Sequence, residues 1–166
     1  MSEETTKISR SAVKEALKDI IPLLTQFCFK NKICGSYRRG LSKISSLDIV
    51  IIPAMTHQIT MSKEAEELFN LIKSRNKKTH TVFQTTEGPI KCTFYIAEEC
   101  DWGAQIITWT GNASMNILMR GRAKNLGYKL NQYGLWENEF RIAGKTERGI
   151  FRKINLTWAE PRQRNR

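Results

Sequence analysis

The stretch CGSYRRGLSKISSLDIVII, residues 34–52, decides how the chain is organised. It runs from a glycine turn through two arginines into an apolar, β-branched segment, which predicts a buried strand. A P-loop is excluded, because no Gly-Lys-Ser/Thr follows Gly35 at the required spacing. The turn still offers an anion its backbone amides and the Ser36 hydroxyl, and the planar guanidinium of Arg39 can bind phosphate oxygens in two places. The strand carries one acidic residue, Asp48, which is the candidate functional carboxylate.

The segments around this strand predict a small α/β (α+β) domain. Apolar residues recur at helical spacing over residues 9–25, where Pro22 is expected to bend or end the helix. Residues 62–75 predict a second amphipathic helix. Residues 80–96 predict a β-hairpin, because two β-rich runs flank a Glu-Gly-Pro turn. This order of elements predicts a small mixed sheet with packing helices within residues 1–100.

The rest of the chain, residues 101–166, is its basic part. The whole chain has 27 Lys and Arg against 16 Asp and Glu, a net charge of +11. Residues 101–166 have 12 Lys and Arg against 5 Asp and Glu, whereas residues 1–100 have 15 against 11. A field of this sign attracts polyanions, so we expect a nucleic-acid partner; a basic solubility surface and an acidic protein partner are the alternatives.

One predicted helix in this basic part carries its polar and basic residues on a single side. Residues 112–126 predict a helix that ends at Gly127. On it Asn116, Arg120 and Lys124 recur every four residues and share one side. Asn, Arg and Lys beside aromatic residues are common where a protein meets a nucleic-acid strand, and a merely solvated charged face is the alternative.

Cysteine usage and hydropathy point to an intracellular protein. The four cysteines form no CxxC pair and both histidines lie far from them, which argues against zinc and for reduced thiols. No run approaches the ~20 apolar residues of a membrane span, and residues 1–10 are polar and acidic, unlike a signal peptide. We therefore expect no membrane contact and a location in the cytoplasm, the nucleus or a viral factory.

Taken together, the motifs resemble those of a known family. The motifs are residues 34–52, WTG at 109–111, MRGRAKNLGYKLNQYGLW at 119–136 and TERGIFRKINLTWAEPRQR at 146–164. In this order they resemble the family X DNA polymerases, which are polymerase-beta-like nucleotidyltransferases. The resemblance runs from Ile33 to Arg162. It implies a nucleotidyltransferase-type palm over residues 1–100 and a small α+β thumb over 101–166, without the lyase and fingers-side domains. This is the minimal form known from African swine fever virus.

The resemblance also implies roles for individual residues. The triphosphate of an incoming nucleotide would be held by Gly35, Ser36 and Arg39. The sugar and base side would be lined by Trp109, Thr110, Gly111 and Asn116. Nucleic acid, with DNA favoured over RNA, would be met by Arg120, Lys124 and Tyr133.

The chain departs from the family at the metal site. Where family members carry Asp-x-Asp this chain has Ser46-Leu47-Asp48, and spacing back from the Thr-Gly pair puts Thr93 at the third aspartate. Nucleotidyl transfer needs two Mg²⁺ ions roughly 3.5–4 Å apart, bridged by carboxylates. Hydroxyl groups are poor replacements, so Asp48 is expected to hold at most a weak, nucleotide-dependent Mg²⁺. Losing the ion at the attacking hydroxyl removes several kcal/mol of transition-state stabilisation. Each ~1.4 kcal/mol changes the rate tenfold, so we expect the rate of nucleotidyl transfer to fall at least about a thousandfold.

Other carboxylates are poorly placed to compensate. The candidates are Glu87 at the hairpin turn and Glu98, Glu99 and Asp101 beyond the second hairpin strand. At ~3.3 Å per residue, five residues from Thr93 correspond to some 16 Å.

Three functions compete on these grounds. The favoured one is a catalytically impaired or inactive family X relative that binds nucleic acid, and dNTP or NTP, as a binding or assembly subunit. The second is an active, gap-filling DNA polymerase with a substitute metal site. The third is a structural protein that reuses the fold for protein contacts.

Overall fold

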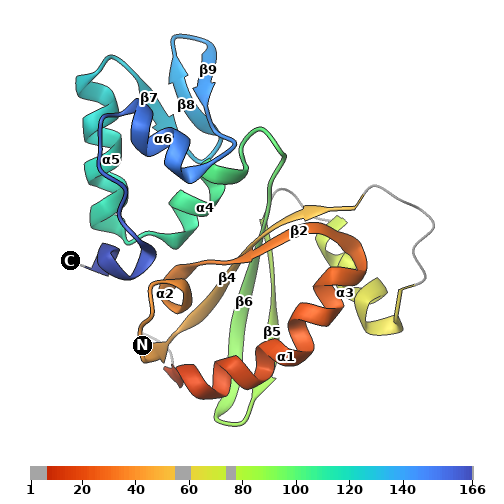
Figure 1. Cartoon of the computed structure of the whole chain (residues 1–166). Coiled ribbons are helices and arrows are strands. Elements are labelled where there is room, and N and C mark those ends of the chain that lie inside the picture. Colours follow the sequence, from red (N-terminus) through yellow and green to blue (C-terminus); the bar gives the residue numbers. More distant parts are fainter. Residues whose placement is uncertain (1–6, 55–60, 74–77, 166) are drawn as a thin grey trace, which may run out of the picture.

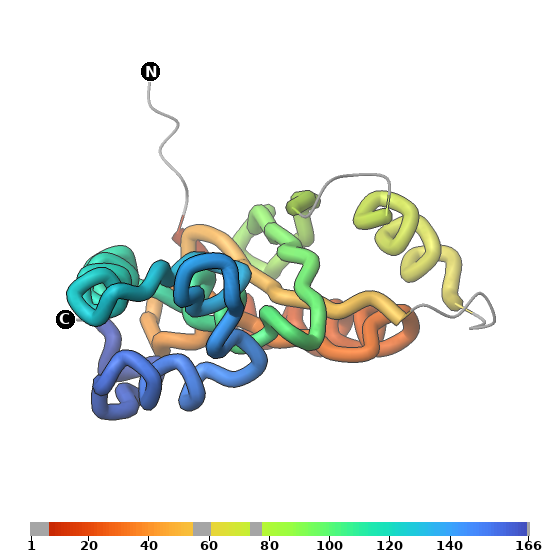
Figure 2. Tube along the Cα trace, turned by 90° about the horizontal axis from the view of Figure 1, so that it is seen from above, coloured from red at the N-terminus to blue at the C-terminus, as the bar shows by residue number. Residues whose placement is uncertain are grey.

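The computed structural model describes residues 7–54, 61–73 and 78–165. They form two packed bodies side by side, of which the first contains the large sheet and the second the C-terminal helices (Figures 1 and 2). The first body consists of β1 (Ile8–Ser9), α1 (Arg10–Phe27), β2 (Cys28–Ile33), α2 (Gly35–Arg38), β3 (Lys43–Ile44), β4 (Ser46–Pro53), α3 (Lys63–Lys73), β5 (Lys78–Thr85) and β6 (Gly88–Ile96). The second consists of α4 (Trp102–Thr110), α5 (Ala113–Asn125), β7 (Lys129–Asn131), β8 (Gly134–Glu137), β9 (Phe140–Ala143), α6 (Glu147–Lys153) and the 3-10 helix η1 (Pro161–Asn165).

The main sheet has the strand order β2-β4-β6-β5. Strand β4 runs parallel to β6 and antiparallel to β2, and β5 pairs with β6 as the hairpin that the sequence predicts. The mixed sheet with packing helices is therefore confirmed. A two-stranded sheet of β1 and β3 and a three-stranded sheet of β7, β8 and β9 complete the topology.

Helix α1 begins at a side-chain cap and continues through a proline. The Ser9 hydroxyl accepts a hydrogen bond from the backbone N–H of Ala12 at 3.2 Å and so caps α1. Of the two expectations for Pro22, bending or ending the helix, ending was wrong, because α1 continues through Pro22 to Phe27. Its ring removes one N–H donor, but the buried stripe on either side of it packs against the sheet and holds the helix together.

The two faces of the main sheet have different partners. One face is covered by α1 and α3, which cross it in Figure 1. The fully buried strand residues Leu47, Ile49 and Phe94 pack there, and burial of such a side chain stabilises the fold by roughly 1.5–3 kcal/mol. The opposite face carries Val50 and Tyr95, which contact α4 of the second body. This second face is left partly open, and it is where a site can form.

The second body has a core of its own. Its buried members are Ala104, Ile107, Met119, Ala123, Leu135, Ile150, Phe151 and Ile154. Helices α4 and α6 approach so closely that a Cβ on Gly103 would lie 2.3 Å from the backbone of Thr146. The predicted helix over 112–126 is confirmed as α5, with Asn112 as its cap. Among the described residues, no helix is long and apolar enough to cross a bilayer.

Candidate nucleotide and nucleic-acid site

Asp48 lies on the open face of the main sheet, beside the positions where the family's other two aspartates are expected. In the parallel pairing of β4 with β6, Asp48 is directly opposite Thr93. Ser46 precedes Asp48 by two residues on β4 and therefore points to the same face. The structure thus brings the three positions together, and Asp48 supplies the carboxylate among them.

Both oxygens of Asp48 have neighbours within the protein. Oδ1 accepts a hydrogen bond from the Tyr95 hydroxyl at 3.1 Å. Oδ2 packs against Gly35, where a Cβ would lie only 2.4 Å from it. Glycine is required at that point for this approach, and also because its φ is +60°. Burial raises the pKa of Asp48, and the Tyr95 hydrogen bond and the charges of Lys78 and Arg39 partly offset that rise.

An aromatic pair with a lysine beside it stands next to this carboxylate. The rings of Tyr95 and Trp109 stack with centroids 3.6 Å apart and an interplanar angle of 14°. Lys78 lies directly opposite Tyr95 across the β5–β6 ladder, and its Nζ is 5.5 Å from the Tyr95 centroid and 5.9 Å from the Trp109 centroid. Trp109 is held by a hydrogen bond from its Nε1 to Oε1 of Gln105 at 2.8 Å. Lys78 and Tyr95 were not among the sequence-predicted residues.

The Arg39 side chain reaches from the glycine turn to the second body. Its Nη1 donates to the carbonyl of Thr110 and its Nε donates to Oδ1 of Asn165 at 2.9 Å. Asn165 donates in return to the Arg39 carbonyl at 2.9 Å. A Cβ on Gly111 would be 3.4 Å from Nη1, so the Thr-Gly pair and the Arg39 guanidinium are neighbours. Ser36 lies half-buried in α2 beside this turn.

The adjacent Arg38 takes part in a partly buried ion network that joins the two bodies. Its guanidinium pairs with Glu147 at 2.6 Å and also donates to the Thr110 hydroxyl at 2.8 Å. Glu147 pairs in turn with Arg164 at 3.2 Å, whose side chain is 1% exposed. Sequence reasoning missed this network, because its three members are separated by 109 and 17 positions. Glu147 is the first residue of α6, which Thr146 caps by accepting a hydrogen bond from the Gly149 N–H.

The α5 surface carries the residues predicted to meet nucleic acid. Arg120 and Lys124 are both exposed, one turn apart. Asn116 is half-buried, and its Nδ2 donates to the Thr108 carbonyl at 2.9 Å. On the same helix Ile117 and Leu118 are 71% and 53% exposed, which is unusual for large apolar side chains. We call the surface formed by Asn116, Arg120 and Lys124 the α5 face.

Tyr133 lies at the turn between β7 and β8. Its backbone N–H donates to Oδ1 of Asn131 at 2.9 Å, and its side chain is half-buried.

The residues around Asp48 do not fit a two-metal centre. Nowhere in residues 7–54, 61–73 and 78–165 do three His, Cys, Asp or Glu side chains come close enough to hold an ion. The four carboxylates considered as substitutes are engaged elsewhere. Glu87 accepts from Ser9 and Glu99 pairs with Lys30 at 2.8 Å. Glu98 accepts from the Cys100 thiol, and Asp101 from the Glu98 N–H.

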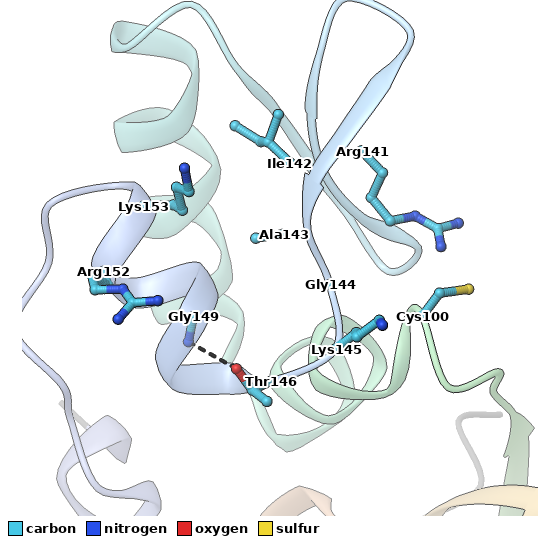
Figure 3. A pocket seen from close by; sticks show the side chains of 10 residues that line it. All are labelled: Cys100, Arg141, Ile142, Ala143, Gly144, Lys145, Thr146, Gly149, Arg152 and Lys153. Atoms are coloured by element: carbon cyan, nitrogen blue, oxygen red, sulfur yellow. Dashed lines mark hydrogen bonds between the residues drawn. The ribbon is translucent and has the colours of Figure 1, made fainter.

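A separate pocket opens on the second body, away from the sequence-predicted residues (Figure 3). Its volume is about 490 Å³. It is lined by Cys100, Arg141, Ile142, Ala143, Gly144, Lys145, Thr146, Gly149, Arg152 and Lys153. Part of the positive charge of residues 101–166 therefore lies on β9, α6 and the turn between them, and not on the α5 face.

Comparisons with known proteins agree with this architecture. The family model of the DNA polymerase beta thumb matches residues 105–165. The repair DNA polymerase X of African swine fever virus is 35% identical over 162 residues in one isolate, covering 81% of this chain and 91% of the viral protein. In a second isolate it is 35% identical over 136 residues, covering 78% of each chain.

Two larger cellular polymerases also match. DNA polymerase lambda of Arabidopsis thaliana is 27% identical over 168 residues, covering 81% of this chain. DNA polymerase IV of Saccharomyces cerevisiae is 41% identical over 69 residues, covering 40% of this chain. The chain spans only 32% and 12% of these two proteins, respectively, but most of the viral one.

The mixed sheet and the thumb match show a polymerase-beta-like nucleotidyltransferase architecture, a palm followed by a thumb. The chain belongs to the family X DNA polymerases, in their minimal form.

Proposed function

We propose that this chain is a nucleic-acid-binding member of family X whose polymerase chemistry is impaired or absent, and that it acts as a binding or assembly subunit. The observation that carries the proposal is the arrangement of Asp48 beside Ser46 and Thr93, with one carboxylate where the reaction uses three.

The missing carboxylates impair the reaction at the attacking hydroxyl, because a metal ion there would have too few protein ligands. Two metal ions stabilise an in-line phosphoryl transfer by activating the nucleophile and by neutralising charge on the phosphates. Asp48 alone supplies one charged ligand, and its Oδ1 already accepts from Tyr95. Mg²⁺ can still be carried in by nucleotide phosphates and touch one carboxylate, but the ion at the nucleophile lacks its ligands.

Residues 1–100 would serve as the palm and residues 101–166 as the thumb of this protein. The α5 face would meet the phosphate backbone of DNA, because Arg120 and Lys124 are exposed and adjacent to Asn116. Tyr133 would lie near the bound strand. A DNA-bound role would place the protein inside the cell.

The nucleotide pocket would be formed by residues that the fold has already brought together. Gly35 contacts Asp48, and Arg39 contacts the Thr110-Gly111 turn. Trp109 stacks on Tyr95, and Asn116 donates a hydrogen bond to the carbonyl of Thr108, the residue before Trp109. With Ser36 these residues offer donors and an aromatic wall to a dNTP or NTP. A purely structural use of the fold would not require them to remain assembled.

A primer-extension assay tests the catalytic part of the proposal. The substrate is DNA with a one-nucleotide gap, with Mg²⁺ or Mn²⁺, and the proteins are the parent and Asp48→Ala. We expect no extension by either protein under conditions where both bind the gapped DNA. Robust extension by the parent that Asp48→Ala abolishes would instead establish the active, gap-filling polymerase with a substitute metal site.

A further inference from the structure

The surroundings of Asp48 suggest how a triphosphate can be bound without the metal ions for which this site lacks ligands. We propose that the residues around Asp48, on β5, β6, α2 and α4, bind triphosphates independently of divalent cations, with the ammonium of Lys78 and the guanidinium of Arg39 supplying the positive charge. This inference rests on the proposed function, since it concerns the same nucleotide pocket.

Lys78 is fixed in the right place by the sheet. It is the first residue of β5 and lies opposite Tyr95, whose hydroxyl donates to Asp48. Residues directly opposite on neighbouring strands point to the same face, so Lys78 projects onto the open face that carries Asp48. Its Nζ lies within 6 Å of both stacked rings, and its charge lowers the pKa of Asp48. The ammonium is exposed and remains accessible to an anion.

The balance of charge at this point favours an anion. Asp48 is the carboxylate at the site, and the positive charges of Lys78 and Arg39 each lower its pKa. A divalent ion approaching Asp48 would meet two positive side chains and a carboxylate oxygen already bonded to Tyr95. A triphosphate carries several negative charges and would be attracted by the same arrangement.

Arg39 retains donors for such a ligand. Its Nε and Nη1 are used by Asn165 and Thr110, and among the described residues its Nη2 group has no hydrogen-bond partner. An arginine has five N–H donors in a fixed fork, so Nη2 can bind phosphate while the other two groups stay in place. The Ser36 hydroxyl, half-buried in the same turn, is a third donor.

Isothermal titration calorimetry with dATP, in EDTA and in excess Mg²⁺, tests the proposal on the full chain. We expect the Kd for dATP in EDTA to lie within about threefold of its value in Mg²⁺. Lys78→Ala should raise the Kd in EDTA about tenfold, as expected for loss of a charged contact worth ~1.4 kcal/mol. Lys78→Arg should restore most of the affinity. Lys14→Ala is the charge-matched control, because Lys14 is exposed on α1 across the sheet, and it should bind like the parent.

Inorganic tripolyphosphate separates recognition of the phosphates from recognition of the base. We expect it to displace dATP in EDTA. Binding of dATP that appears only with Mg²⁺, an unchanged Kd in Lys78→Ala, failure of tripolyphosphate to compete, or no dATP binding in either buffer would each overturn the proposal. A parallel titration with gapped DNA distinguishes failure of this inference from failure of the proposed function. DNA binding together with dATP binding that requires Mg²⁺ refutes this inference alone, whereas loss of both DNA and dATP binding refutes the proposed function as well.

Discussion

The hydroxyl of Tyr95 donates a hydrogen bond to Oδ1 of Asp48 at 3.1 Å. The bond joins adjacent parallel strands, β4 and β6, and ties the remaining carboxylate of the site to a side chain that is itself stacked on Trp109. Asp48 is therefore held by the protein in the absence of any ion, and this has consequences for stability that can be measured.

Removing the hydroxyl in Tyr95→Phe should destabilise the fold. A hydrogen bond to a charged group contributes about 1.5–3 kcal/mol, and its loss would leave Asp48 buried with less compensation. We expect the free energy of unfolding in urea at pH 7 to fall by about 1–3 kcal/mol. The loss should be smaller at a pH low enough to protonate Asp48. An equal loss at both pH values would show that the hydroxyl contributes through packing and not through the carboxylate charge.

Removing the charge in Asp48→Asn should stabilise the fold at pH 7, whereas Tyr95→Phe should destabilise it. Burial raises the folded-state pKa of Asp48 above its unfolded value. The contribution of such a group to stability is fully present below the unfolded pKa and falls as pH rises through the folded pKa. At pH 7 the ionised Asp48 therefore costs stability, and we expect Asp48→Asn to raise Tm at pH 7 and to bring no gain at low pH. A lower Tm at pH 7 would mean that Lys78 and Arg39 more than offset burial.

The Arg38–Glu147–Arg164 network should be a strong determinant of how the two bodies are joined. Glu147→Gln leaves the buried Arg164 and the half-buried Arg38 without their carboxylate, and breaking a buried pair costs about 3–5 kcal/mol. We expect a loss of that size in urea unfolding. Glu139→Gln, at an exposed position between β8 and β9, is the matched control and should change stability by less than about 0.5 kcal/mol. Similar losses in both variants would mean that the free energy of unfolding depends on net charge and not on the ion network.

The α5 face should determine how DNA affinity depends on salt. Each phosphate contact contributes to the slope of log affinity against log salt, so Arg120→Ala with Lys124→Ala should make the slope shallower by roughly 1–2 units. Fluorescence anisotropy with gapped DNA at several salt concentrations measures this, and circular dichroism checks folding.

The control for this prediction removes the same charge from the same body. Lys145→Ala with Lys153→Ala takes two cations from the pocket of Figure 3, away from the α5 face. We expect its slope to stay closer to that of the parent than the slope of the α5 variant. Equal changes in the two double variants would show that binding follows net charge and would refute the assignment to the α5 face.

Much of the fold could be predicted from local patterns. The buried β4 follows from its apolar run, the β5–β6 hairpin from its turn residues, and α5 from Asn112 and its helical spacing. The resemblance to family X assigned Thr93 to the position of the third aspartate through its spacing from the Thr-Gly pair, and the structure places Thr93 opposite Asp48.

The interactions across the chain could not be predicted in this way. The Tyr95–Asp48 bond and the position of Lys78 depend on which strands are neighbours in the sheet, and periodicity carries no information about that order. The Arg38–Glu147 pair connects the two bodies and depends on how they pack. The local signal at Pro22 left bending and ending of the helix both open, and tertiary packing decides that α1 continues to Phe27.

The central claim is that missing carboxylates account for impaired catalysis on an otherwise intact site. The most direct measurement is primer extension on gapped DNA by the double variant Ser46→Asp plus Thr93→Asp, beside the parent protein, with Mg²⁺. The variant places three carboxylates on one face of β4 and β6, so we expect extension that the parent lacks and a Tm that rises on adding Mg²⁺. Extension by the parent equal to that of the variant, or no extension by a folded, DNA-bound variant whose Tm rises with Mg²⁺, would contradict the account.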